Sequence, residues 1–247
     1  TGVYKQDSGQ VTVCGVPVYE NRHAKERIVS IPDDWFYYNQ STIWEMAKLY
    51  AGMYPQFDRE RFNKLRELFR LPEKKPIRRM SKGMQRQAAF WITMSCMPEY
   101  LVLDEPVSAL DVSIQAQVLN LMEELQEKFG LTYLFISHDL SVVKHISDTI
   151  AVMYLGKIVE TAECRDLFSR PLHPYTQALL SAVPIPSIDY HVERIVLEGD
   201  VPSPINPEPG CRFAGRCRFC EERCHKEMPE LKDMGNGHFV ACHLVNG

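Results

Sequence analysis

The stretch YLVLDEPVSALD at positions 100–111 constrains the fold more than any other part of the sequence. Four apolar residues at 100–103 lead directly into Asp104 and Glu105. A short apolar run of this kind predicts a buried strand of a parallel sheet. Ligands of open α/β folds bind at the carboxyl ends of such strands. The stretch therefore predicts an α/β fold that places two carboxylates at a ligand-binding edge.

A second strand, TYLFIS at 132–137, is expected to carry His138 to the same edge. Asp104 is placed to hold Mg²⁺, directly or through water, and Glu105 to activate a water molecule for attack on a γ-phosphate. A lone histidine is more often structural, and Glu105 could be one more carboxylate at a strand end. The position of His138 after a buried strand, and of Glu105 directly after Asp104, favours the functional interpretation.

Composition limits the remaining possibilities. The chain has 247 residues, of which 45% are hydrophobic and 24% charged, and its net charge is −4. Nothing in this balance indicates a surface that binds nucleic acid. No apolar run approaches the roughly 18–20 residues that span a bilayer, so contact with a membrane would go through partner subunits. Residue 1 is Thr, and we expect the native N-terminus to lie upstream.

Alternating strand and helix patterns extend over the first two thirds of the chain, and they predict a largely parallel, covered sheet. Short strands are expected at 10–13 and 27–31, and the turn Gly156-Lys157 is expected to close a hairpin. The expected helices are 41–52, 58–70 with Asp58 as N-cap, 81–97 from Ser81, 113–129 ending at Gly130, 140–147, and a stretch from about 163.

The segment MSKGMQRQ at 80–87 precedes the Asp-Glu strand. Ser81 can cap a helix whose free N–H groups and dipole attract an anion. Gly83 would keep the backbone close to such a ligand. The plainer alternative is a serine-capped helix with a basic face. The nearby Asp-Glu strand favours the ligand-binding interpretation.

Together, the Asp-Glu pair, the histidine after the next strand and MSKGMQRQ resemble the ATPase subunits of ABC transporters. The resemblance implies a P-loop NTPase-like core with a helical subdomain at about 33–97. MSKGMQRQ would be a variant of the family signature L-S-G-G-Q, in which Lys82 and Met84 replace a Gly and the Gln. In the family, this signature faces the γ-phosphate of ATP held by the opposite subunit.

Further family motifs map onto Asp111 and Asp33. Asp111 matches the loop that crosses the dimer interface, and His138 matches the histidine that contacts the γ-phosphate. Asp33, in SIPDD, stands where the family usually has Gln and could still reach Mg²⁺. The phosphate-cradling motif G-x-x-x-x-G-K-S/T is not present in the sequence. We therefore expect a truncation downstream of that motif, and a chain that does not bind ATP normally by itself.

Five cysteines crowd the last 37 residues, which in a chain without a secretion signal favours a metal over disulfides. The segments RPLHPYTQALLSAVP and GDVPSPINPEPGCRFAGRC and the closing ACH resemble the C-terminal extension of oligopeptide and dipeptide ABC importers. That resemblance implies a 4Fe–4S cluster on Cys211, Cys217, Cys224 and Cys242, with Cys220 as a bystander. A Zn²⁺ site is the chief rival. Thiols without a metal are a further alternative.

The parts of the chain before and after LDEP at 103–106 resemble different subfamilies. Residues 1–106 are similar to Gram-positive exporter-type ABC ATPases, whereas residues from about 107 are similar to oligopeptide and dipeptide importers. The chain is therefore either a natural hybrid or two joined fragments. As domains we expect an ABC ATPase domain at 1–162, without its P-loop, and a small cysteine-rich extension at 163–247.

The resemblance implies a subunit that binds ATP and Mg²⁺ and couples ATP hydrolysis to transport, most simply peptide import. It would act at the cytoplasmic face of the membrane with transmembrane permease subunits, a second ABC ATPase subunit and, indirectly, an extracellular solute-binding protein. One alternative is a non-catalytic subunit that lends its signature to a partner ATPase. A weaker alternative is a soluble ABC-type ATPase that acts on nucleic acid, which the acidic net charge disfavours.

Overall fold

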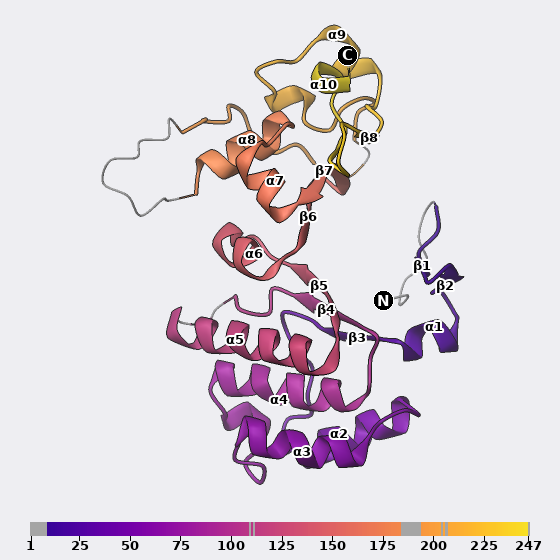
Figure 1. The fold of residues 1–247 in the computed structure, drawn as a ribbon, viewed down its shortest axis with the longest axis vertical. Helices are drawn as coiled ribbons and strands as arrows, with labels where there is room; N and C mark the ends of the chain where they lie inside the picture. The colour runs from indigo at the N-terminus through magenta and orange to yellow at the C-terminus, as the bar shows by residue number, and fades with distance from the viewer. Residues whose placement is uncertain are drawn as a thin grey trace. The chain divides into compact units, whose positions relative to one another are not determined.

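Figure 1 shows the computed structural model, which describes residues 9–108, 110, 112–183, 194–203, 205 and 207–246. The chain divides into two compact units, Thr1–His138 and Asp139–Gly247. The boundary expected at 162/163, between the ABC ATPase domain and the cysteine-rich extension, stays a prediction. The compact units divide earlier, directly after His138.

A parallel sheet organises the N-terminal unit. Its strands are β3 (Ile28–Ile31), β4 (Tyr100–Asp104) and β5 (Thr132–Ile136), with β4 in the centre. The register pairs Ile31 with Leu103 and Asp104 with Ile136. The residues that follow β4 and β5 are therefore adjacent, as the apolar runs predict.

Helices α2 (Ile43–Met53), α3 (Arg59–Phe69), α4 (Lys82–Ser95) and α5 (Val112–Phe129) complete this unit, with a 3-10 turn at Ile77–Arg79. Each of the first three helices begins at a side-chain cap: Thr42 in a capping box, Asp58 and Ser81. Gly130, with φ at +63°, follows the end of α5. The helix starts at Asp58 and Ser81 and the stop at Gly130 confirm the sequence predictions.

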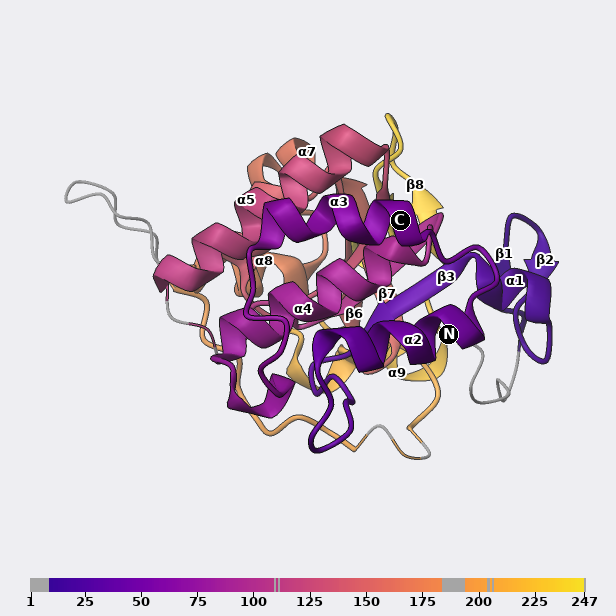
Figure 2. The same cartoon turned by 90° about the horizontal axis from the view of Figure 1, so that it is seen from below.

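The core of the helical part is aromatic. The rings of Phe62 and Trp91 stack with centroids 4.8 Å apart, and Phe69 lies against Trp91 at 6.1 Å. The indole N–H of Trp91 donates to the carbonyl of Phe62 at 2.8 Å, so the one polar group of this buried ring is satisfied. These contacts join α3 to α4, which Figure 2 shows lying side by side.

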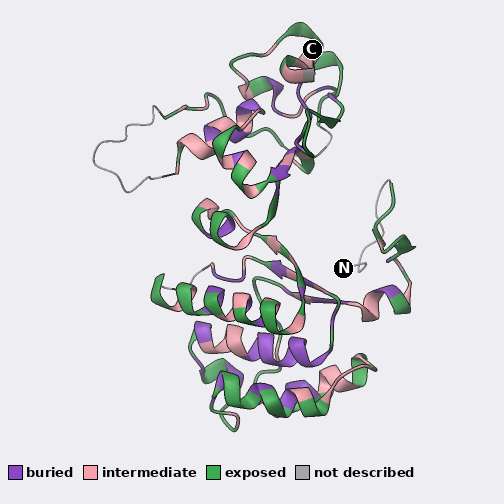
Figure 3. Ribbon diagram, in the orientation of Figure 1, coloured by how far each residue is buried: buried purple, intermediate pink, exposed green. Residues whose placement is uncertain are grey.

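The sheet is less covered than the sequence pattern predicts. Leu101 and Leu103 on β4 are buried, but Leu134 and Ile136 on β5 expose 59% and 48% of their surface. In Figure 3, which colours residues by burial, β4 alternates intermediate and buried positions up to Leu103, and β5 alternates exposed and intermediate ones. The strand and helix pattern predicts a covered sheet, whereas among the described residues one face of β5 is open.

The beginning of the described chain adds a small hairpin, β1 (Thr12–Val13) and β2 (Val16–Pro17), and the short helix α1 (Arg22–Glu26). This helix was not predicted, because only five residues support it and its single buried residue is Ala24. Asn21 caps it by accepting from the backbone N–H of Ala24.

An antiparallel sheet organises the C-terminal unit, in the order β6 (Thr149–Tyr154), β7 (Lys157–Glu163), β9 (Phe239–Val240) and β8 (Lys232–Asp233). The hairpin turn lies at Leu155-Gly156, where both φ angles are positive, and not at Gly156-Lys157 as predicted. Because β7 pairs with β9, the cysteine-rich end of the chain shares a sheet with the hairpin.

This unit also contains the short helices α6 (Leu140–Ile146), α7 (Cys164–Ser169), α8 (Pro174–Ser181), α9 (Glu222–Lys226) and α10 (His243–Asn246), with a 3-10 turn at Ala214–Arg216. The largest fully buried side chain of this unit is Phe213. Among the described residues, no helix of either unit is long and apolar enough to cross a membrane.

Candidate active site

Glu105 and His138 meet where β4 and β5 end. Nδ1 of His138 lies 2.7 Å from Oε1 of Glu105, and the backbone N–H of His138 donates to the same oxygen at 3.0 Å. Ser137 donates to the other carboxylate oxygen at 3.3 Å. The imidazole is 80% exposed, so this carboxylate–imidazole pair is open to a ligand. Such a pair can accept and move a proton at the edge of the sheet.

The backbone of Glu105 is strained. Its φ is +45°, a left-handed conformation that residues with a side chain rarely adopt. The backbone N–H of Glu105 donates to the carbonyl of Ile136 at 2.9 Å, which holds the residue against β5. Strain of this kind, about 1–3 kcal/mol, concentrates at functional sites. The turn places the carboxylate of Glu105 toward His138.

Asp104 is exposed at the last position of β4. Exposure leaves its carboxylate open to a cation, and carboxylate oxygens are the ligands that Mg²⁺ prefers. Its assignment to Mg²⁺ stays a prediction.

Arg86 on α4 joins the ends of β3 and β4, and the sequence motifs do not single it out. Its guanidinium donates to the carbonyls of Pro32 and Asp33, to the Asp33 carboxylate at 2.9 Å and to the carbonyl of Glu105 at 3.4 Å. Burial lowers the pKa of Arg86, and the charge of Asp33 opposes this. Arg86 lies three residues after buried Gly83 and four before buried Phe90. That helical spacing places it on the buried face, and an arginine there is the signal that could have found it.

Asp33 belongs to the same network. Its carboxylate accepts from Arg86 and, at 2.7 Å, from the hydroxyl of Ser108, which also donates to the carbonyl of Glu105. The structure therefore brings Asp33 to the strand ends, as expected. One of its oxygens is already engaged by two donors, and its contact with Mg²⁺ stays a prediction.

The signature segment forms the first turn of α4. Ser81 accepts from the backbone N–H of Met84 at 3.3 Å, and Lys82 is exposed. Gly83 is buried against α5, where an added Cβ would lie 2.4 Å from Cγ2 of Ile114. The packing of α4 against α5 thus requires a glycine here, whether or not the backbone of Gly83 also approaches a ligand. Asp111 lies outside the described residues.

The cysteines of the tail converge. The backbone N–H of Cys211 donates to the carbonyl of Cys224 at 2.8 Å. Burial raises the pKa of the Cys211 thiol to about 11, and the nearby Cys224, Cys242 and Cys217 add to the rise. Gly210 permits the approach, because its φ is +93° and a Cβ there would lie 2.4 Å from the carbonyl oxygen of Cys224.

Convergence does not amount to a formed metal site. Within the part of the chain that the structure describes, no three His, Cys, Asp or Glu side chains are positioned to hold one metal ion. The sulfur of Cys220 lies 3.2 Å from Nε2 of His225 and so has a partner of its own.

The HPY segment surrounds a buried carboxylate, that of Glu160 on β7. Glu160 accepts from the backbone N–H groups of Leu172 at 2.7 Å and His173 at 2.9 Å, and lies 2.7 Å from Nε2 of His238. His173 caps α8 by accepting from the backbone N–H of Tyr175 at 3.0 Å. The contacts give HPY a structural role.

Comparisons with known proteins match both parts of the chain. A family model described as "ABC transporter" matches residues 1–108, and one described as "Oligopeptide/dipeptide transporter, C-terminal region" matches residues 159–224. Both parts of the chain are thus similar to ATP-binding proteins of ABC transporters. This confirms the family resemblance inferred from the motifs. The exporter-type likeness of residues 1–106 stays a prediction.

Named transport proteins are similar to this chain over about two thirds of its length. It is 56% identical over 168 residues to the oligopeptide transport ATP-binding protein AppF of Bacillus subtilis, covering 67% of this chain and 51% of AppF. It is 52% identical over 166 residues to the dipeptide transport ATP-binding protein DppF of Escherichia coli, covering 67% and 49%. The chain thus spans about half the length of the curated relatives it matches.

Solved structures confirm the fold. The structure of cbiO1 from Clostridium perfringens, part of the ABC transporter complex cbiONQ, matches with a TM-score of 0.57 and 21% identity. The match covers 68% of this chain and 71% of that one. A structure titled as the ATP binding subunit of an ABC transporter matches with a TM-score of 0.58, also at 21% identity. The predicted α/β ABC ATPase fold is therefore correct.

Proposed function

We propose that this protein is the ATP-binding subunit of a peptide-importing ABC transporter and couples ATP hydrolysis to transport. The observation that carries the proposal is the pairing of Glu105 with His138 at the carboxyl edge of a parallel sheet in an ABC-family chain. The names of its relatives, which are oligopeptide and dipeptide transport proteins, support peptides as the cargo.

Each site residue has a role in this proposal. Asp104 helps to hold Mg²⁺, Glu105 polarises the attacking water, and His138 holds the γ-phosphate. The two carboxylates and the imidazole at this edge of the sheet have the chemistry that these tasks need. The sequence has no G-x-x-x-x-G-K-S/T, so the edge residues alone do not cradle the nucleotide phosphates.

The signature residues act on a partner. Ser81, Lys82, Gly83 and Met84 present the start of α4, with its free N–H groups, to ATP held by a second ABC ATPase subunit. We place this assembly at the cytoplasmic face of the membrane, on permease subunits that receive peptide from an extracellular solute-binding protein.

Glu105→Gln tests the catalytic role. In a protein that joins this chain to a phosphate-binding loop, the change should lower ATP turnover about 100-fold or more and leave ATP binding unchanged, because an amide binds similarly but cannot accept the proton. The readouts are phosphate release and equilibrium nucleotide binding. Glu67→Gln, on the exposed face of α3, is the matched control. Unchanged turnover in Glu105→Gln would exclude this role.

A second function is a non-catalytic subunit that lends its signature to a partner, and the exposure of Ser81 and Lys82 at the start of α4 supports it. In that case the unaltered 247-residue chain would raise the ATPase rate of a loop-bearing ABC subunit, and Ser81→Arg would remove the increase by blocking the helix start. If the chain leaves the partner's rate unchanged, the second function is wrong.

We also propose that Cys211, Cys217, Cys224 and Cys242 hold a 4Fe–4S cluster, with Zn²⁺ as the alternative. The backbone hydrogen bond between Cys211 and Cys224 brings two of them together and supports a shared site. Protein purified without oxygen should contain about four irons per chain and absorb light at about 400 nm. Cys224→Ser should lose the metal, whereas Cys220→Ser should keep it. Colourless protein with one zinc per chain would replace the cluster by the zinc site.

A further inference from the structure

A cavity of about 620 Å³ lies in the C-terminal unit, and Cys217, one of the converging cysteines, is part of its lining. It lies between the start of α8, the extended segment 194–198 and the 3-10 turn at Ala214–Arg216. Its volume falls within the range of about 300–1,000 Å³ that is typical of small-molecule sites. Of the residues that line it, Cys217 has a role in the function proposed above, as a cluster ligand, and the others have none.

The floor of the cavity is apolar and firmly packed. Phe213 is buried, and its ring contacts those of Tyr154 and Tyr175 with centroids 5.2 and 5.4 Å apart. Pro174 and the half-buried Ile195 and Leu197 complete the apolar lining. Because the Phe213 ring is held by its neighbours on several sides, this floor is formed before any ligand arrives.

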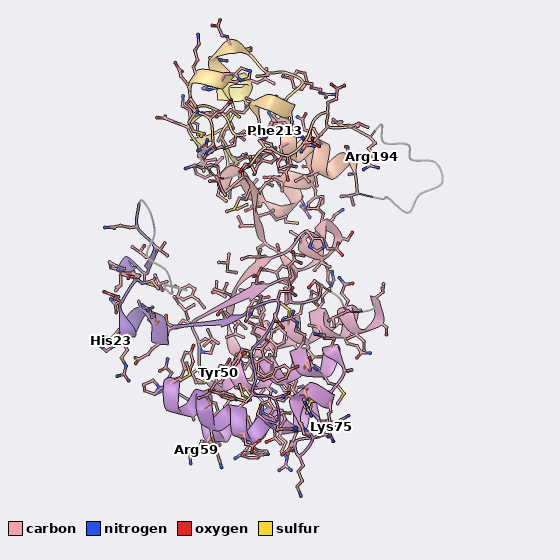
Figure 4. All side chains as sticks on the ribbon, turned by 180° about the vertical axis from the view of Figure 1, so that it is seen from behind. His23, Tyr50, Arg59, Lys75, Arg194 and Phe213 are labelled. Carbon is pink, nitrogen blue, oxygen red and sulfur yellow. The ribbon has the colours of Figure 1, made fainter. Side chains whose placement is uncertain are left out.

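The rim of the cavity carries positive charge. Three arginines, Arg194, Arg216 and Arg218, line it against a single carboxylate, Glu198. Arg216 donates to the backbone carbonyl of Glu198 at 3.3 Å, not to its carboxylate. Among the ion pairs found in the described residues, none involves these three guanidinium groups. Figure 4 labels Arg194 and Phe213, which mark the rim and the floor.

We propose that this cavity is a binding site for a small organic anion with an apolar body. The apolar part would lie on Phe213, Ile195 and Leu197, and the anionic head would lie among the arginines, which bind carboxylate and phosphate groups through their paired N–H donors. Carboxylate and phosphate heads share this chemistry. Comparing how well octanoate and octyl phosphate each displace a bound anion from the cavity would show which head group it prefers.

Gly215 offers a way to close the cavity without changing its charge. It lines the cavity, its φ is not positive, and an added Cβ would have no atom within 4 Å. A larger side chain at this position therefore extends into open space and leaves the fold intact. Gly52, at the end of α2, has the same open surroundings in the other unit and gives a matched control.

The probe is 8-anilinonaphthalene-1-sulfonate, an anion with an apolar body whose fluorescence rises on binding, titrated into the full chain. Gly215→Leu should weaken its binding at least about tenfold, and the Arg194→Gln/Arg218→Gln double variant about three- to tenfold, equivalent to about 0.7–1.4 kcal/mol. Gly52→Leu and Arg170→Gln, an exposed arginine of the same unit, should leave the affinity unchanged.

The neutral analogue N-phenyl-1-naphthylamine separates charge from shape. Its binding should be weakened by Gly215→Leu and unaffected by the double arginine variant. The exposed Leu134 and Ile136 can also attract such dyes, so the variants decide the assignment. If sulfonate binding is the same in Gly215→Leu as in the parent chain, the dye binds elsewhere and the proposal is overturned. The result is independent of ATP turnover, so failure here leaves the proposed function unaffected.

Discussion

At the scale of single residues, the C-terminal unit depends on polar groups buried together. Glu160 is fully buried and accepts from two backbone N–H groups as well as facing His238. A buried carboxylate is tolerated only when it is satisfied in this way. His173 is also buried, and its Nδ1 must stay unprotonated to accept from Tyr175.

His173 gives this unit a pH dependence. Burial lowers its pKa from 6.5 to about 4, and the charge of Glu160 only partly offsets this. Between these values the unfolded chain binds a proton that the folded chain does not, so the free energy of unfolding falls as the pH falls from 6.5 to 4. The loss from this one group is up to about 3 kcal/mol. Denaturant unfolding at a series of pH values measures it.

His173→Asn provides the comparison. An asparagine can cap α8 through its side-chain oxygen but does not titrate. Below pH 6.5 the variant should therefore lose less stability than the parent chain. Equal pH profiles for the two proteins would mean that His173 does not cause the dependence.

At the scale of elements, α4 connects the helical part to the strand ends. Its first turn packs Gly83 against Ile114 of α5, and Arg86 reaches the ends of β3 and β4. The cap at Ser81 and the helix itself could be predicted from local pattern. The partners of Gly83 and Arg86 could not, because they lie 31 and up to 54 residues away and depend on docking.

Gly83→Ala should destabilise the N-terminal unit by about 1–3 kcal/mol, because its Cβ would overlap Cγ2 of Ile114, a branched side chain with little freedom to move. The measurement is the denaturation midpoint. Gly52→Ala is the control: nothing lies near its Cβ, and alanine is the better helix former, so it should be neutral or stabilise by up to about 1 kcal/mol. If Ile114→Ala fails to relieve the cost in the double variant, the overlap is not its cause.

At the scale of the whole molecule, the chain has two compact units, each with its own buried aromatic residues: Phe62 and Trp91 in one, Phe213 and Tyr154 in the other. We expect two unfolding transitions in calorimetry. Gly83→Ala should lower only the transition of the N-terminal unit, and a change from pH 7 to pH 5 should lower that of the C-terminal unit more. A single transition that both changes shift together would contradict this.

The sequence by itself determined the features that depend on neighbours along the chain: the caps at Asp58 and Ser81, the apolar strands, and the delivery of Glu105 and His138 to one edge. Local pattern suffices there, because strand direction and helix capping depend on residues a few positions apart.

The tertiary structure alone decided the pairings that close over long distances. These are Arg86 with Asp33 and Glu105, Glu160 with His238 across 78 positions, and the cavity beside Phe213. The open face of β5 and the position of the hairpin turn belong with them. Such features depend on how elements dock, and side-chain packing between distant segments leaves no periodic signal in the sequence.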